Sequence, residues 1–109
     1  MPPVEIALSP TVARPGDEIT AIVRNQSPRR LQFGVGYRLE RSRGGVWRRV
    51  DYDYDYAVMD IALEVAPGAE SDPEQIPLPR SLRPGRYRVV KRCEGRGTFT
   101  QAADLQVTR

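Results

Sequence analysis

Carboxylates and phenol rings alternate in one six-residue stretch: Asp51, Tyr52, Asp53, Tyr54, Asp55 and Tyr56. On an extended strand, residues two apart point the same way, so the carboxylates would share one face and the rings the other. Clustered carboxylate oxygens suit Ca²⁺. The stretch lacks the glycine turn and the distal glutamate of the usual calcium loop, so a solvated acidic face is favoured and no metal is predicted.

The same six residues, named here the Asp–Tyr stretch, are the candidate surface for a protein partner. Tyrosine offers a large contact area at low entropic cost and is enriched at interfaces. The alternative is that Tyr52, Tyr54 and Tyr56 pack on the core or shield a sheet edge. Changing all three to serine separates the two, because only a surface role leaves folding intact.

Cys93 is the single cysteine, and the chain contains no histidine. A catalytic cysteine or serine needs a neighbouring base, and histidine is the usual one. Arg92 and Arg96 could lower the pKa of the Cys93 thiol, but a buried, unreactive thiol is the favoured interpretation. Paired carboxylates for glycoside hydrolysis remain compatible with the composition, yet no cleft-sized scaffold is evident. We therefore predict that the chain is not an enzyme and uses no cofactor.

The net charge of +3 comes from sixteen arginines and one lysine against fourteen acidic residues. The arginines occur in every segment, and aromatic residues do not alternate with them as in a base-stacking platform. No nucleic-acid partner is predicted. No run approaches the roughly 18 apolar residues needed to span a bilayer, and residues 1–3 lack the basic and apolar parts of a signal peptide. No membrane insertion is predicted, and the compartment is left open.

Period-two alternation of apolar residues dominates the chain and predicts half-buried strands. Its clearest run covers Leu31–Leu39, where Gly34 and Gly36 mark a possible bulge or close backbone approach. Val46–Tyr52 follows the tight turn at Gly44 and Gly45 and should pair back as a hairpin. The other predicted strands are Val4–Leu8, Ile19–Val23, Met59–Val65, Ile76–Leu78, a strand from Tyr87, and Ala103–Val107.

Turn residues recur about every ten positions between these strands, and no segment has a convincing helical period. The prediction is an all-β fold: an immunoglobulin-like β-sandwich of seven or eight antiparallel strands, forming one domain over residues 1–109. A single cysteine permits no internal disulfide, so the fold depends on packing alone.

Two segments carry a family resemblance. Phe33-Gly34-Val35-Gly36-Tyr37-Arg38-Leu39-Glu40-Arg41 precedes Gly45-Val46-Trp47, and Leu82-Arg83-Pro84-Gly85-Arg86-Tyr87 continues to Lys91. In this order, over about residues 18–92, the chain resembles bacterial immunoglobulin-like domains. The resemblance implies a sandwich, no catalytic residues and often an exported or envelope setting.

One position in the second segment has a physical explanation. Tyr87 stands where a tyrosine-corner residue would bond back to the upstream backbone, and Leu82 would close the end of the core.

We therefore expect a non-catalytic structural or protein-binding module, whose partner is another protein or the remainder of a larger one. Proteinase inhibition through a loop of the sandwich is the alternative, since a family of bacterial intracellular proteinase inhibitors is similar in length and pattern. Its candidate loop is the proline-spaced segment Pro73–Arg80, with Arg80 or a neighbour offered to the protease. The competing interpretation of that segment is an edge strand protected by proline.

Overall fold

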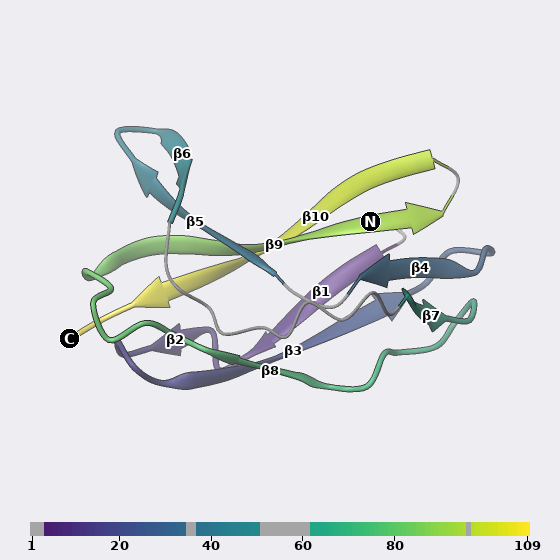
Figure 1. Cartoon of the computed structure of the whole chain (residues 1–109), viewed down its shortest axis with the longest axis horizontal. Coiled ribbons are helices and arrows are strands. Elements are labelled where there is room, and N and C mark those ends of the chain that lie inside the picture. Colours follow the sequence, from purple (N-terminus) through teal and green to yellow (C-terminus); the bar gives the residue numbers. More distant parts are fainter. Residues whose placement is uncertain (1–3, 35–36, 51–61, 96) are drawn as a thin grey trace.

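The computed structural model describes residues 4–34, 37–50, 62–95 and 97–109, which form ten β-strands in two sheets (Figure 1). The strands are β1 (Val4–Ser9), β2 (Val12–Ala13), β3 (Glu18–Asn25), β4 (Leu31–Gly34), β5 (Arg38–Arg43), β6 (Val46–Arg49), β7 (Ala62–Val65), β8 (Glu74–Pro77), β9 (Gly85–Gly95) and β10 (Gly97–Val107). The all-β sandwich prediction is confirmed. Among the described residues, no helix is long and apolar enough to cross a membrane.

The smaller sheet has the order β1-β3-β8, and all its pairs are antiparallel. The larger sheet has the order β2-β10-β9-β4-β7, with β5 pairing β9 and carrying β6 on its other side. The two-residue β2 pairs in parallel with the end of β10. The long β9–β10 hairpin extends across the molecule, while the β5–β6 hairpin projects from it (Figure 1).

The predicted continuous strand over Leu31–Leu39 is divided into β4 and β5, which pair one after the other with β9. Phe33 lies opposite Cys93, and Arg38 lies opposite Val90. The chain therefore advances five residues from Phe33 to Arg38, while β9 advances only three between their partners. The excess of two residues is even, so the odd-numbered positions stay on the core face. Alternation within the chain therefore continues across the change of register, which is why it could not reveal the division.

Ten strands replace the seven or eight predicted because of this division and because β2 is too short to show a period. The final strand also begins earlier than predicted, at Gly97 instead of Ala103, since its first half alternates weakly. In the predicted Met59–Val65 strand, Ala62–Val65 is β7, and residues 59–61 lie outside the described residues.

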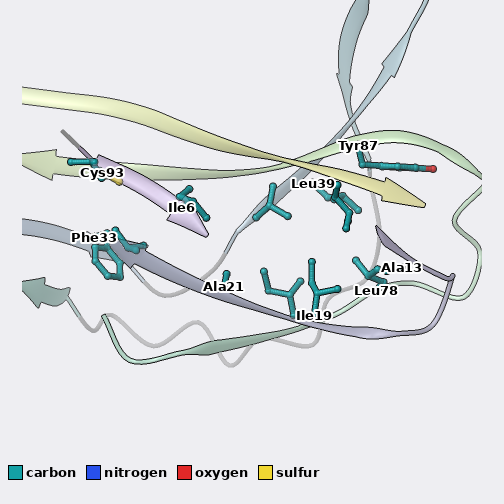
Figure 2. Close-up of a cluster of buried hydrophobic side chains, with 14 of the residues drawn as sticks. Ile6, Ala13, Ile19, Ala21, Phe33, Leu39, Leu78, Tyr87 and Cys93 are labelled. Carbon is teal, nitrogen blue, oxygen red and sulfur yellow. The ribbon is translucent and has the colours of Figure 1, made fainter. Parts of the chain in front are cut away.

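The core lies between the two sheets, where the apolar side chains of the alternating runs meet (Figure 2). Ile19, Ala21 and Val23 of β3 are fully buried, in keeping with their predicted inward face. Phe33, Leu39 and Val89 close the layer from the larger sheet. Burial of such side chains at roughly 1.5–3 kcal/mol each stabilises a fold that has no disulfide.

The tyrosine corner is confirmed at the end of this core. Tyr87 is buried, and its hydroxyl donates a 2.7 Å hydrogen bond to the carbonyl oxygen of Arg83. Figure 2 shows the Tyr87 ring within the cluster, with its hydroxyl oxygen directed toward the end of the sandwich. Leu82 is buried in the same cluster, as predicted. This bond ties the loop before β9 to the strand that follows it.

The predicted hairpin after Gly44-Gly45 is also confirmed. Arg43 pairs with Val46, and the two glycines between them have φ of 58° and 79°. Positive φ at both central residues is the requirement of the two-residue turn whose twist matches antiparallel strands. The second strand ends at Arg49, earlier than the predicted Tyr52.

Candidate functional site

The Asp–Tyr stretch, with Asp51, Tyr52, Asp53, Tyr54, Asp55 and Tyr56, lies outside the described residues. The structure fixes the residue before it. The Val50 N–H donates a 2.9 Å hydrogen bond to the Leu39 carbonyl, and the Val50 side chain packs against the core. The candidate surface therefore begins at the foot of the β5–β6 hairpin.

That hairpin carries Trp47, the only tryptophan, on the outer face of the larger sheet. The Arg88 guanidinium carbon lies 4.3 Å from the centre of the Trp47 ring, and that of Arg86 lies 5.5 Å away. A guanidinium over an indole face contributes about 0.5–1 kcal/mol at an exposed site and more when desolvated. These contacts hold the projecting hairpin against β9.

Glu40 completes this arginine–tryptophan cluster, which consists of Arg38, Glu40, Trp47, Arg86 and Arg88. The carboxylate of Glu40 accepts a hydrogen bond of 2.6 Å from Arg88 Nε and one of 3.0 Å from Arg38 Nε. The residue is only 8% exposed, so its charge is held by two guanidinium groups instead of water.

The cluster was not predicted from the sequence, because its members come from three strands and the arginines are scattered along the chain. Arg86 and Arg88 share one face of β9 by their two-residue spacing, and Glu40 lies opposite Arg88 in the β5–β9 pairing. The hairpin register places Trp47 opposite Ser42, two residues from Glu40 on the same face. The two-residue spacings were available in the sequence, but the strand pairing that joins them was not.

A buried cation lies on the inner face of β9, opposite the face that carries Arg86 and Arg88. Lys91 is 1% exposed, and its Nζ is 3.3 Å from Glu74 Oε1. The Nζ also lies 3.9 Å from the centre of the Tyr37 ring and 4.7 Å from that of Phe33. Burial lowers the Lys91 pKa because it disfavours the ammonium form, and the nearby Glu74 carboxylate partly opposes this.

Lys91 was not singled out as a functional residue from the sequence. Lys91 is two residues from both Val89 and Cys93 in β9, and this two-residue spacing predicts that its side chain points into the core. The lysine amine therefore lies between the sheets, against aromatic faces and the Glu74 carboxylate, and is not offered to a substrate at the surface.

Cys93 is fully buried, as favoured from the sequence. Burial raises the pKa of its thiol, and the Lys91 charge beside it opposes this only in part. The suggestion that Arg92 lowers the thiol pKa is therefore wrong, since Arg92 is exposed on the other face of β9. Arg96 lies outside the described residues. In the described ranges, no group of three or more His, Cys, Asp or Glu side chains is arranged to hold a metal ion.

The proline-spaced segment Pro73–Arg80 includes β8, an edge strand of the smaller sheet. Ile76 and Leu78 are buried in the core, and the Leu78 N–H donates a 2.8 Å hydrogen bond to the Asp17 carbonyl. Arg80 is exposed, with its side chain close to Gly16. This arrangement agrees with the interpretation of Pro73–Arg80 as an edge strand, because alternate side chains anchor the segment to the sandwich.

A family model described as "Bacterial Ig-like domain" matches residues 4–106, nearly the whole described fold. A comparison with curated protein sequences finds no match.

Solved structures with a similar fold come from very different proteins. The sporulation control protein Spo0M from Bacillus subtilis superposes with a TM-score of 0.52 at 19% identity, over 97% of this chain and 49% of that one. The PapD-like domain 7 of human CEP192 gives a TM-score of 0.44 at 15% identity, over 99% of this chain and 87% of that domain. The alkylpurine DNA glycosylase AlkC from Pseudomonas fluorescens gives 0.49 at 15%, over 98% and 31%. The chain thus spans about half the length of Spo0M, and at this identity the likeness shows the fold alone.

Proposed function

Because the chain belongs to the family of bacterial Ig-like domains, we propose that it is a non-catalytic module that binds a protein partner or joins parts of a larger protein. Family membership over residues 4–106 is the observation that carries this proposal. A sandwich built around a filled core presents surfaces and edges for contact.

The state of the reactive side chains supports a non-catalytic role. Burial of Cys93 raises the pKa of its thiol, which disfavours the nucleophilic thiolate. Lys91 is enclosed between the sheets beside Glu74. In the arginine–tryptophan cluster, Arg38 and Arg88 bond to Glu40, and the Arg86 and Arg88 guanidinium groups lie over Trp47. These groups are engaged in holding the hairpin to β9.

The proposed partner surface is the Asp–Tyr stretch, Asp51–Tyr56. It follows Val50, whose backbone bond to Leu39 and packing on the core give the surface a firm attachment. Val50 itself follows the β5–β6 hairpin, which the Trp47 contacts with Arg86 and Arg88 tie to β9. A surface mounted on a fixed support loses less conformational freedom on binding than one on a free loop.

The test is site-specific photo-crosslinking in the bacterium that encodes the chain. A photoreactive residue placed at Tyr54 is expected to give a discrete protein adduct. The matched control carries the same residue at Val12, which is 55% exposed and far from the stretch in the chain. Combining the probe with serine at Tyr52 and Tyr56 should abolish the adduct without lowering the melting temperature.

Two results would contradict the proposal. The same protein captured in equal yield from Tyr54 and from Val12 would mean that the stretch has no selective partner, and unfolding of the serine variant would assign the tyrosines to the core. A titration against serine and cysteine proteases tests the alternative function. Inhibition at one-to-one stoichiometry, with the chain uncut, would replace the module by an inhibitor.

A further inference from the structure

The strand β10 leaves most of one edge open among the described residues. On one side it pairs with β9 along its whole length, from Gly97 to Val107. On the other side only Gln106 and Val107 are paired, with the short β2. The strand β1 packs against β10 from the opposite sheet and pairs only with β3. The free edge therefore spans Gly97–Leu105.

The direction of the backbone groups follows from the bonds to β2. The N–H groups of Gln106 and Thr108 donate to the carbonyls of Thr11 and Ala13, each at 2.9 Å, on the side away from β9. Backbone groups of alternate residues point to the same edge of a strand. The residues that present their N–H and C=O to the free edge are thus Thr98, Thr100, Ala102 and Asp104.

This edge lacks the proline and arginine residues that protect the edge strands β8 and β6. The edge strand β8 ends in Pro77 and is flanked by Pro73 and Pro79. The edge strand β6 has Arg48 and Arg49 among its four residues. In contrast, Gly97–Leu105 contains no proline, no cation and one charged residue. Proteins normally blunt an exposed edge with such residues, so a long edge without them is typical of a strand that pairs with another chain.

We propose that β10 pairs antiparallel with β10 of a second copy of this chain, which joins the two larger sheets across a twofold axis. The axis passes Gln101, so Gln101 faces its own copy, and Thr100 and Thr98 lie opposite Ala102 and Asp104. This register brings every edge-facing residue opposite another edge-facing residue. It forms about eight backbone hydrogen bonds, two for each of four bonded pairs.

The ends of the edge and its side chains fit a second copy. The paired stretch is bounded at one end by β2 and at the other by the β9–β10 turn, so each copy's turn arrives where the partner's β2 begins. On the inner face, Phe99 comes opposite Ala103, a large side chain against a small one. Both are only partly buried in the single chain, and pairing would cover them.

Asp104 is the one charge on the edge, and in this register it never faces its own copy. It lies opposite Thr98, while its carboxylate is held by Arg86 of its own chain at 3.4 Å. A heterologous occupant would need no such twofold fit. This self-association is independent of the Asp–Tyr stretch.

The first test is sedimentation and light scattering of the chain over a range of concentrations, with two matched variants. Ala102 is exposed, and its N–H points away from β9, so Ala102→Pro should fold while losing two of the intermolecular bonds and adding a clash. The association constant for dimerisation of Ala102→Pro should be at least tenfold lower than that of the parent chain. Ala102→Ser keeps the N–H and should dimerise like the parent. Equal melting temperatures for the two diluted variants establish that proline leaves the monomer folded.

Two site-specific readouts identify the surface. In hydrogen exchange, the amides of Thr100, Ala102 and Asp104 should become protected as concentration rises, while those of Gln101 and Ala103 are protected throughout by β9. Under mild oxidation Gln101→Cys should cross-link two chains. Facing residues of a non-bonded antiparallel pair are roughly 4.5 Å apart, within reach of a disulfide. Thr100→Cys, which faces Ala102, is the control and should cross-link poorly.

A chain that stays monomeric at millimolar concentration would overturn the proposal and leave the edge to an extended segment of another protein. A dimer that Ala102→Pro does not weaken, or that protects none of the three amides, would assign self-association to a different surface and overturn it equally.

Discussion

The tyrosine corner offers a clean measurement, because Tyr87→Phe removes one hydroxyl and leaves the buried ring in place. The Tyr87 hydroxyl donates to the Arg83 carbonyl at 2.7 Å, and the residue is 1% exposed. A hydrogen bond of this kind contributes about 0.5–1.5 kcal/mol net. Arg83 itself is exposed, so water can reach its carbonyl in the variant and the full desolvation penalty does not apply.

We therefore expect Tyr87→Phe to lower the free energy of unfolding by about 1 kcal/mol. For a domain of this size, that loss corresponds to a fall in melting temperature of roughly 4–8 °C. Urea unfolding followed by the fluorescence of Trp47, the single tryptophan, gives both the midpoint and the slope. The slope should not change, because the variant exposes the same surface on unfolding.

Arg41→Gln is the matched control for the same corner. Its guanidinium carbon lies 5.8 Å from the centre of the Tyr87 ring, and its Nη2 donates to the Pro84 carbonyl at 3.2 Å. This exposed bond should be worth less than the tyrosine bond. An unchanged stability for Tyr87→Phe, or a larger loss for Arg41→Gln, would refute the assignment of the corner to the hydroxyl.

Three further outcomes are expected. Glu40→Gln should cost about 1–2 kcal/mol, because two guanidinium groups lose their shared carboxylate, and the Trp47 emission should shift to the red; an unshifted emission would mean that the hairpin does not depend on Glu40. Because the folded-state pKa of Lys91 is lowered, the unfolded chain binds more protons between that pKa and the ordinary lysine value, so stability should rise with pH across this window. Lys91→Met should lack that rise. Identical pH profiles of melting temperature for the parent chain and Lys91→Met would contradict a lowered Lys91 pKa in the folded state. The melting temperature should be the same in millimolar calcium and in a chelator, and a calcium-dependent increase would revive a metal site at Asp51–Tyr56.

The candidate partner surface was proposed from composition alone, because six alternating carboxylates and rings are unusual in any context. It stays a prediction, since Asp51–Tyr56 lies outside the described residues. The arginine–tryptophan cluster shows the opposite case. Glu40, Trp47 and Arg88 are unremarkable where they stand in the sequence, and they gather only because β5 pairs with both β6 and β9.

The sequence by itself determined the strand type, the inward faces and the tyrosine corner. These depend on the two-residue period and on residues a few positions apart, such as Tyr87 and Arg83, which local geometry brings together. The edge position of β8 was also readable, because proline cannot donate to a neighbouring strand.

Tertiary structure decided the rest. The two-residue change of register between β4 and β5, the burial of Lys91 against Phe33, and the open edge of β10 all depend on which strands become neighbours. Pairing joins segments far apart in the chain, and its energy depends on both partners at once. No alternation within one segment records it, so the edge that can accept a second chain becomes visible only when the sheets are assembled.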